Sequence, residues 1–209
     1  MGWYADWMLP RIVDLSMRSS EFTPVRARVL SGLNGEVLEI GFGSGLNLPH
    51  YPLEVTRLLA IDPAVAGRKL AAKRIAASPV PVEFAGLDAG SLPTGDDSVD
   101  HVLSTWTLCT VPDPARALAE IRRVLRPGGF LHFAEHGLSP EAKVARMQRR
   151  LNPVQRRVFG GCHLDRPIDQ LITAAGLNMT RLETYYLPGP RFVGYTFEGL
   201  ATAAAGCPT

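Results

Sequence analysis

The chain has 209 residues, of which 46% are apolar and 20% are charged, with a formal net charge of +2. This length and apolar content favour one folding unit, 1–209, with a sizeable core. The near balance of charge argues against the strongly basic surface of a nucleic-acid-binding protein. The three cysteines show no paired spacing, and neither a secretion signal nor a membrane-spanning run is apparent, so we expect a cytoplasmic protein.

The first 34 residues precede any strand pattern, and we expect them to form a helical segment (1–34). Its aromatic and soft apolar side chains are Trp3, Tyr4, Trp7 and Met8. Such a surface is suited to close over a bound ligand as a lid that keeps water out. Packing in an ordinary core is the alternative that stays open.

Short apolar runs then alternate with helical patterns up to residue 136. The runs end at turn residues, as strands buried on both faces of a parallel sheet do. The stretches between them are rich in helix formers and begin with proline or with an Asp-Pro pair. Strands are predicted at 35–41, 57–62, 80–86, 98–106 and 130–136, and helices at 63–78 and 113–125.

The remaining residues change character. Helices are predicted at 139–152, which is strongly basic, and at 166–176, which ends in glycine. Strands follow at 178–187 and 191–203, joined by the turn "PGP" and therefore antiparallel. We thus predict an α/β fold: a doubly wound, Rossmann-like sheet of seven strands, mostly parallel with a C-terminal antiparallel hairpin, and with helices on both faces. The ligand crevice of such a sheet lies at the carboxyl ends of the first, second and fourth strands.

A glycine-rich loop ends the first predicted strand, with glycines at positions 41, 43 and 45. At a crevice, glycine lets a ligand approach the main chain where any Cβ would block it, although a tight turn alone would also explain the pattern. Acidic residues stand at three strand ends: Glu39, Asp62 and Asp88. Carboxylates suit ribose hydroxyls and an exocyclic amine better than they suit phosphates, which predicts an adenosine ligand without a pyrophosphate.

A nicotinamide dinucleotide is the competing ligand. It would call for Gly-x-Gly-x-x-Gly, and the position of the third glycine is Leu46 here. Pro49 and Pro52 would also interrupt the long helix that faces a pyrophosphate. The sequence therefore disfavours a dinucleotide.

Four motifs in order, "VLEIGFGSG", "LLAIDP", "LDAGSLPTGDDSVDHV" and "EIRRVLRPGGFLHFAEH", resemble those of the class I S-adenosylmethionine (SAM)-dependent methyltransferases. Within that superfamily, "LNLPHYP", "TLCTVPDPARAL", "EHG" and "GCHLDR" resemble small bacterial relatives of the membrane-associated thiol S-methyltransferases (methyltransferase-like proteins). The resemblance implies SAM as the cofactor and S-adenosylhomocysteine as the product. It also implies a SAM-binding core at 35–136, and acceptor-side helices with the terminal hairpin at 137–209.

The resemblance assigns roles to single positions. Glu39 would orient the glycine loop and the methionine amino group, and Asp62 would hold the ribose hydroxyls. The adenine would pack on Pro63 and donate from its amine to Asp88. The full expected set is Glu39, Gly41, Gly43, Gly45, Asn47, Asp62, Pro63, Asp88, Ala89, Ser104 and Thr105, of which Ala89 offers its amide to the adenine ring and Ser104 and Thr105 face the methionine end.

Methyl transfer from a sulfonium is an in-line displacement that mainly needs positioning. A thiol or protonated amine acceptor must also lose a proton. His136, at the crevice end of the fifth predicted strand, is the first candidate base and His163 the second, although both could be structural. Cys109 either lines the acceptor pocket or acts as a small buried apolar residue. No metal site is expected: His132 and His136 are four apart on a strand, the cysteine and histidine of "GCHLDR" are adjacent, and no further ligands converge.

The acceptor pocket is expected from the parts least like the general family, namely the N-terminal segment, the basic helix and the link to the terminal strands. Between 139 and 157, an apolar stripe of Val144, Met147 and Leu151 lies among basic residues. Such a helix either touches an anionic membrane surface weakly or is simply solvated. The sequence leaves the oligomeric state open.

Together these features predict a SAM-dependent methyltransferase for a small, apolar acceptor that reacts through sulfur or nitrogen. A lipid or quinone methyltransferase is the alternative within the class. A non-catalytic SAM-binding module that regulates a partner is the alternative from another class, against which the intact acids and glycines argue.

Overall fold

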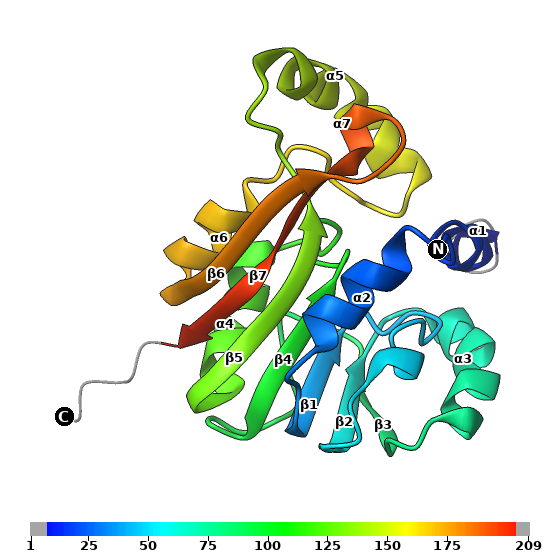
Figure 1. Cartoon of the computed structure of the whole chain (residues 1–209), viewed down its shortest axis with the longest axis vertical. Coiled ribbons are helices and arrows are strands. Elements are labelled where there is room, and N and C mark those ends of the chain that lie inside the picture. Colours follow the sequence, from blue (N-terminus) through cyan, green and yellow to red (C-terminus); the bar gives the residue numbers. More distant parts are fainter. Residues whose placement is uncertain (1–7, 204–209) are drawn as a thin grey trace.

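The structure, a computed structural model, describes residues 8–203 and arranges seven strands of that span in one sheet. The strands are β1 (Gly35–Ile40), β2 (Val55–Ile61), β3 (Val82–Gly86), β4 (Val99–Thr105), β5 (Leu125–His136), β6 (Leu177–Tyr186) and β7 (Tyr195–Ala203). Their order is β3-β2-β1-β4-β5-β7-β6 (Figure 1). The first five strands are parallel, and β7 runs antiparallel to both β5 and β6. The predicted sheet and its antiparallel end are confirmed.

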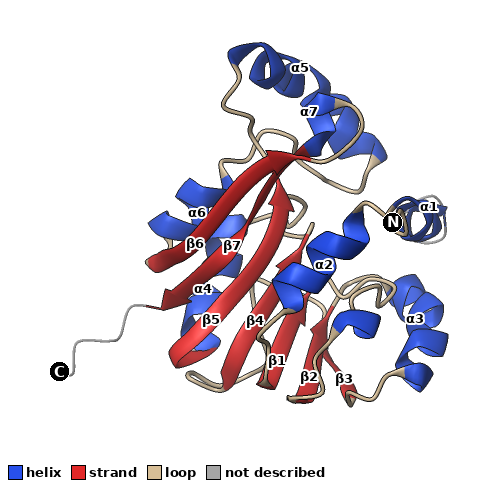
Figure 2. Cartoon of the chain, in the orientation of Figure 1, coloured by secondary structure: helices blue, strands red, loops and turns tan. Residues whose placement is uncertain are grey.

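Helices cover both faces of this sheet (Figure 2), as predicted. They are α1 (Leu9–Ser16), α2 (Phe22–Leu30), α3 (Val65–Ala77), α4 (Pro114–Val124), α5 (Ala142–Val158), α6 (Ile168–Ala174) and α7 (Arg191–Gly194). Ile121 of α4 and Ile172 of α6 share a core cluster with Leu38 of β1. Val29 of α2 belongs to a second cluster with Val37, the neighbour of Leu38. Adjacent residues of one buried strand therefore face two separate cores.

Two sequence signals place elements as predicted. The Asp113 side chain caps α4 by accepting a hydrogen bond from the Arg116 amide at 3.0 Å, and Pro114 takes the first helical position. After the glycine loop there is only one short 3₁₀ turn, Leu48–His50, before the prolines end it. The long helix that a dinucleotide would require is therefore missing from this part of the described chain.

The predicted starts of two strands, at 130 and 191, are wrong. β5 begins at Leu125, which pairs with Val99, while Phe130 pairs with His101. Residues 126–129 are thus accommodated as an irregularity in which Gly128 has a φ of 82°. The second strand of the hairpin begins at 195, because 191–194 form α7 instead. β6 and β7 still pair antiparallel, as predicted. Only the connection between them differs from the predicted turn.

The basic helix is longer than predicted and packs through a different face. α5 continues to residue 158, past Pro153, whose exposed position lets water replace the missing backbone donor. Met147 is 50% exposed, whereas Gln148 is fully buried. Gln148 donates to the carbonyls of Gly137 and Phe192 and accepts from the Ser139 amide. These bonds fix α5 beyond the carboxyl end of β5 (Figure 1).

Candidate functional site

The glycine loop follows β1, and its three glycines have φ angles between 56° and 73°. A Cβ on Gly41 would lie 1.9 Å from the Thr107 hydroxyl oxygen, and one on Gly45 would lie 3.0 Å from Leu48. The nearest atom to a Cβ on Gly43 is 3.8 Å away, which leaves room for a ligand. The expectation that a ligand excludes a Cβ at all three positions is wrong for Gly41 and Gly45, because the chain's own side chains fill that space.

A buried hydrogen-bond network lies beside this loop. Glu39, near the end of β1, accepts from the Asn47 side-chain amide at 2.8 Å and from the Tyr51 hydroxyl at 2.7 Å. The same amide donates to the Thr105 hydroxyl at 2.9 Å. Burial raises the pKa of Glu39 to about 7, although the bonds from Tyr51 and Asn47 lower it. Three predicted residues thus form one unit, and Tyr51 is a member that the sequence did not reveal.

Asp62, which follows β2, binds the loop itself. Its two carboxylate oxygens accept from the amides of Gly43 and Ala64, each at 2.6 Å. Burial raises the pKa of Asp62. The hydrogen bonds from the two amides lower it, but burial has the larger effect. Each oxygen can still accept a second hydrogen bond. The ribose contact of Asp62 stays a prediction, and the structure adds that this carboxylate orders the glycine loop.

The predicted adenine end is more open to solvent. Pro63 and Asp88 are exposed, and Ala89 is half-buried. Asp88 accepts from the Gly90 amide at 2.8 Å, which fixes the loop after β3. These residues stand at the ends of two neighbouring strands, and their contacts with adenine stay predictions.

Ser104 does not reach the crevice. It is fully buried, and its hydroxyl donates to Glu135 at 2.6 Å. Glu135 also accepts from the amides of Thr107 and Cys109, at 3.0 and 3.2 Å. The expectation that the Ser104 side chain faces the methionine end is therefore wrong. With Glu135, it instead shapes the loop that follows β4.

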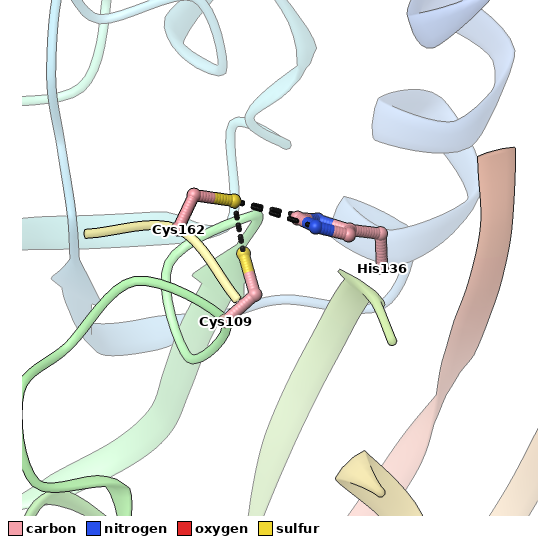
Figure 3. A group of neighbouring side chains, drawn as sticks. All are labelled: Cys109, His136 and Cys162. Carbon is pink, nitrogen blue, oxygen red and sulfur yellow. Dashed lines mark hydrogen bonds between the residues drawn. The ribbon is translucent and has the colours of Figure 1, made fainter. Parts of the chain in front are cut away.

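Three buried side chains that are far apart in sequence meet near the carboxyl ends of β4 and β5 (Figure 3). The Cys162 sulfur lies 3.8 Å from the Cys109 sulfur and 3.3 Å from Nε2 of His136. The expectation that no metal ligands converge is wrong, because these three ligand atoms lie within 4.8 Å of one another. The His163 ring is outside this cluster, 4.0 Å from the Asp165 carboxylate.

The ionisation states in this Cys109–His136–Cys162 cluster depend on one another. The bond with Cys109 and the contact with His136 lower the pKa of Cys162 to about 4. Burial raises the pKa of Cys109 well above its usual range. Burial lowers the pKa of His136, but the contact with Cys162 raises it, and the pKa is raised overall. In the absence of a bound ion, these shifts favour a thiolate at Cys162 and an imidazolium at His136. Reactive cysteines beside a histidine have the same ionisation states.

Comparisons with known proteins identify the family. Residues 38–133 match a family model described as a methyltransferase domain. Thiol S-methyltransferase TMT1B of Rattus norvegicus is 33% identical over 177 residues, which cover 79% of this chain and 72% of that protein. The chain belongs to the class I SAM-dependent methyltransferases.

Two further comparisons extend over nearly the whole methyltransferase. Phosphatidylethanolamine N-methyltransferase of Cereibacter sphaeroides is 27% identical, covering 90% of this chain and 92% of that protein. A chain in the complex between the Haloferax volcanii Trm112 methyltransferase activator and the putative methyltransferase has a TM-score of 0.69 at 19% identity, covering 96% of both chains. The structural match shows the shared fold alone. SAM is the cofactor of this enzyme family, and the fit of the crevice to SAM can be tested on its side chains.

The residues around Glu39 fit the methionine part of SAM. Asn47 Oδ1 and Arg26 Nε are buried without a hydrogen-bond partner among the described residues. An orphaned acceptor suits an ammonium group, and an orphaned donor suits a carboxylate. Burial lowers the pKa of Arg26 to about 10, while nearby Glu39 raises it. Arg26 stacks on the Trp106 ring at 4.9 Å, and neither residue was found from the sequence, because only the fold brings α2 to the end of β4.

The N-terminal segment binds the glycine loop of the methyltransferase. Asp14 of α1 is 6% exposed and accepts from the Ser44 hydroxyl at 2.5 Å and from Arg18. Arg74 of α3 lies 3.3 Å from the same carboxylate and donates to the Ser44 carbonyl at 2.8 Å. α1 is thus tied to the glycine loop, and its role as part of a lid stays a prediction. The aromatic lid residues Trp3, Tyr4 and Trp7 lie outside the residues that the structure describes.

Proposed function

We propose that this methyltransferase transfers the methyl group of SAM to a small, apolar thiol. The observation that carries the proposal is the 33% identity to a thiol S-methyltransferase across 79% of the chain. The division of the chain supports it: 35–136 would bind SAM, while 1–34 and 137–209 would enclose the acceptor. SAM supplies a methyl group on a positively charged sulfur, which is already activated for displacement.

The protein's part in this reaction is positioning. Holding the acceptor sulfur in line behind the methyl carbon contributes on the order of 7–11 kcal/mol in well-oriented systems. The orphaned Asn47 and Arg26 atoms would hold the methionine end of SAM, and Asp62 would hold the ribose. The acceptor would then approach from the side of β4 and β5, where the loop after β4 carries Cys109 and the end of β5 carries His136.

The thiol must lose its proton before it attacks. His136 and His163 are the two predicted bases. His136 is 9% exposed and contacts Cys162, whereas His163 is more open and points to Asp165. The position of His136 at the end of β5 favours it for any role in proton removal.

The direct test is methyl transfer from SAM to a panel of thiols and amines of graded size and polarity. We expect an apolar alkyl or aryl thiol to be methylated with the highest kcat/KM. A calorimetric titration with SAM and with NADH should show binding of SAM alone. SAM binding without turnover on any acceptor would favour the regulatory module and contradict the proposal.

A lipid amine is the second candidate acceptor, favoured by the 27% identity to phosphatidylethanolamine N-methyltransferase. The same panel decides between them if it includes phosphatidylethanolamine in vesicles. Preferential methylation of that lipid would replace the thiol proposal, and methylation of a quinone ring carbon would do the same.

The surface of α5 supports weak contact with an anionic membrane. Val154 is 62% exposed and Met147 50% exposed, among exposed basic side chains such as Arg149 and Arg150. None of the helices within 8–203 is long and apolar enough to cross a bilayer. An amphipathic basic helix can still lie on a membrane surface, where apolar acceptors gather. Flotation with vesicles that contain phosphatidylserine should detect binding that weakens in the double variant R149E/R150E. The cytoplasmic location stays a prediction.

A further inference from the structure

The Cys109–His136–Cys162 cluster is assembled from three separate segments. Cys109 lies in the loop after β4, His136 ends β5, and Cys162 lies between α5 and α6. The structure brings one ligand atom of each into a group that spans no more than 4.8 Å (Figure 3). Both cysteines are free thiols. A buried group of two sulfurs and one imidazole nitrogen is a known ligand set for zinc.

The distances agree with a tetrahedral ion. Bonds of about 2.3 Å to sulfur and about 2.0–2.1 Å to nitrogen imply S···S and S···N separations of roughly 3.8 and 3.5 Å at a tetrahedral centre. The observed separations are 3.8 Å between the two sulfurs and 3.3 Å between the Cys162 sulfur and the imidazole. The third pair, the Cys109 sulfur and the imidazole, lies within 4.8 Å. This pair must approach to roughly 3.5 Å for tetrahedral zinc, whereas the other two separations need little adjustment.

The backbone holds the ligands in place without an ion. The His163 amide donates to the Cys109 carbonyl at 2.8 Å, which ties the loop of Cys162 to the loop of Cys109. The Cys109 amide donates to buried Glu135. Arg166 donates to the carbonyl of Leu108. A site whose ligands are fixed by such bonds is preorganised for metal binding.

We propose that Cys109, His136 and Cys162 bind a zinc-class divalent ion whose fourth position receives the acceptor thiol. Three protein ligands with one open position are the mark of a catalytic zinc site, whereas structural sites use four. Cys109 is four residues beyond Thr105, which bonds Asn47 beside the glycine loop, so the end of β4 leads to both groups. This inference rests on the proposed thiol methyltransferase function.

The reaction at this site balances in two steps. The thiol replaces a water on the ion, and its proton passes to solvent, because a coordinating thiol is deprotonated outright. The bound sulfur then attacks the methyl carbon. A new bond forms between this sulfur and the methyl carbon, and the bond between the methyl carbon and the sulfonium sulfur of SAM breaks. Its electron pair stays on that sulfur, which is the thioether sulfur of the product S-adenosylhomocysteine. The thioether leaves, and water returns to the ion. In this scheme His136 is a ligand and not a base.

The test uses the full chain, reduced and stripped with a chelator, in a Cys207→Ser background that leaves only the two cluster thiols. Zinc is titrated against a chromophoric chelator, and cobalt(II) is added as a spectroscopic probe. We expect one ion per chain and a thiolate-to-cobalt charge-transfer band with the intense visible bands of a tetrahedral centre. Cys109→Ser and Cys162→Ser should each lose at least about 100-fold in zinc affinity. The matched control His163→Gln, beside Cys162 but outside the cluster, should bind zinc as the parent does.

SAM affinity within about threefold of the parent will show that the serine variants are folded. Failure of the reduced parent to bind zinc, or equal binding by the serine variants, would overturn the site. A Cys109–Cys162 disulfide whose reduction restores no metal binding would also overturn it and assign the pair a redox role.

The thiol panel separates this inference from the proposed function. We expect the zinc-free protein to lose at least about 100-fold in kcat/KM for thiols and to regain it with zinc. Equal methylation with and without zinc would contradict a catalytic role for the ion and leave the proposed function intact. Zinc binding with no methylation of any thiol would defeat the proposed function and, with it, the role of the fourth position.

Discussion

The two sides of the crevice are built in different ways. On the SAM side, the loop after β1, the acid after β2 and the loop after β3 each carry their residues within a few positions of a strand end. In the Cys109–His136–Cys162 cluster, Cys109 and Cys162 are 53 residues apart, and Cys162 and His136 are 26 apart. A local motif can be recognised in one dimension. A cluster that forms only when two loops and a strand end fold together cannot, which is why the sequence singled out Cys109 and His136 separately and did not predict that both meet Cys162.

The largest effect that would test the SAM side is expected from Asp62→Ala. This change removes the acceptor for the amides of Gly43 and Ala64 and for the predicted ribose hydroxyls. Loss of charge-assisted hydrogen bonds worth about 3 kcal/mol corresponds to roughly 100-fold weaker SAM binding. Calorimetric titration with SAM measures it, and circular dichroism checks the fold.

Asp88→Ala is the matched control for that variant. The Asp88 side chain is exposed and accepts from the nearby Gly90 amide, so its loss should weaken SAM binding by less than about tenfold. Equal effects of the two variants would contradict the separate roles given to the two acids, and an Asp62→Ala protein with unchanged affinity would refute its contact with SAM.

The glycine loop offers a second test, because one alanine substitution should mainly weaken SAM binding and another should mainly lower the stability of the fold. A Cβ on Gly43 enters open space, whereas one on Gly41 collides with Thr107. Both positions have positive φ angles, so each alanine costs about 1–2 kcal/mol of strain. Gly43→Ala should lose tens-fold in SAM affinity, and Gly41→Ala should lower the melting temperature more. The opposite ranking in the two measurements would show that the ligand lies beside Gly41 instead.

These contrasts also show what could be predicted. Apolar runs and proline positions predicted the succession of strands and helices along the chain and the short turn after the glycine loop, because both depend on neighbours in sequence. The side-chain hydrogen bonds inside the crevice could not be predicted in this way. The Ser104 hydroxyl could face either the cofactor or Glu135, and only the packed structure decides between them. Arg26 and Tyr51 were missed for the same reason. Arg26 reaches the site from α2, which carries no motif. Tyr51 stands in the motif "LNLPHYP", but only the folded structure brings its hydroxyl to Glu39.

A third test concerns the buried charge of Glu39. Its pKa rises from 4.5 to about 7 on folding, so the protonated form is favoured in the ligand-free protein. This group therefore contributes stability that is fully present below pH 4.5 and is lost as the pH rises to about 7, at up to about 1.4 kcal/mol per pH unit. The free energy of unfolding of the parent relative to Glu39→Gln should fall over that window.

SAM should reverse this trend, because its ammonium group near Glu39 favours the carboxylate. We expect SAM affinity to rise by about tenfold between pH 6 and pH 8 in the parent and to stay flat in Glu39→Gln. A parallel rise in both proteins would place the titrating group elsewhere and remove the contact between Glu39 and the methionine end.

The smallest effect is expected where the N-terminal segment meets the loop. Asp14→Ala removes the acceptor for Ser44 and Arg18 and leaves Arg74 without its carboxylate. The buried bond should be worth about 1–2 kcal/mol, enough to free α1 from the loop without unfolding the core. If α1 is part of a lid, SAM affinity falls only several-fold while kcat falls further, because water enters the reacting centre. Glu21→Ala, an exposed change in the same segment, controls for charge. Equal kcat values in both variants would make α1 a structural support of the glycine loop and not a lid.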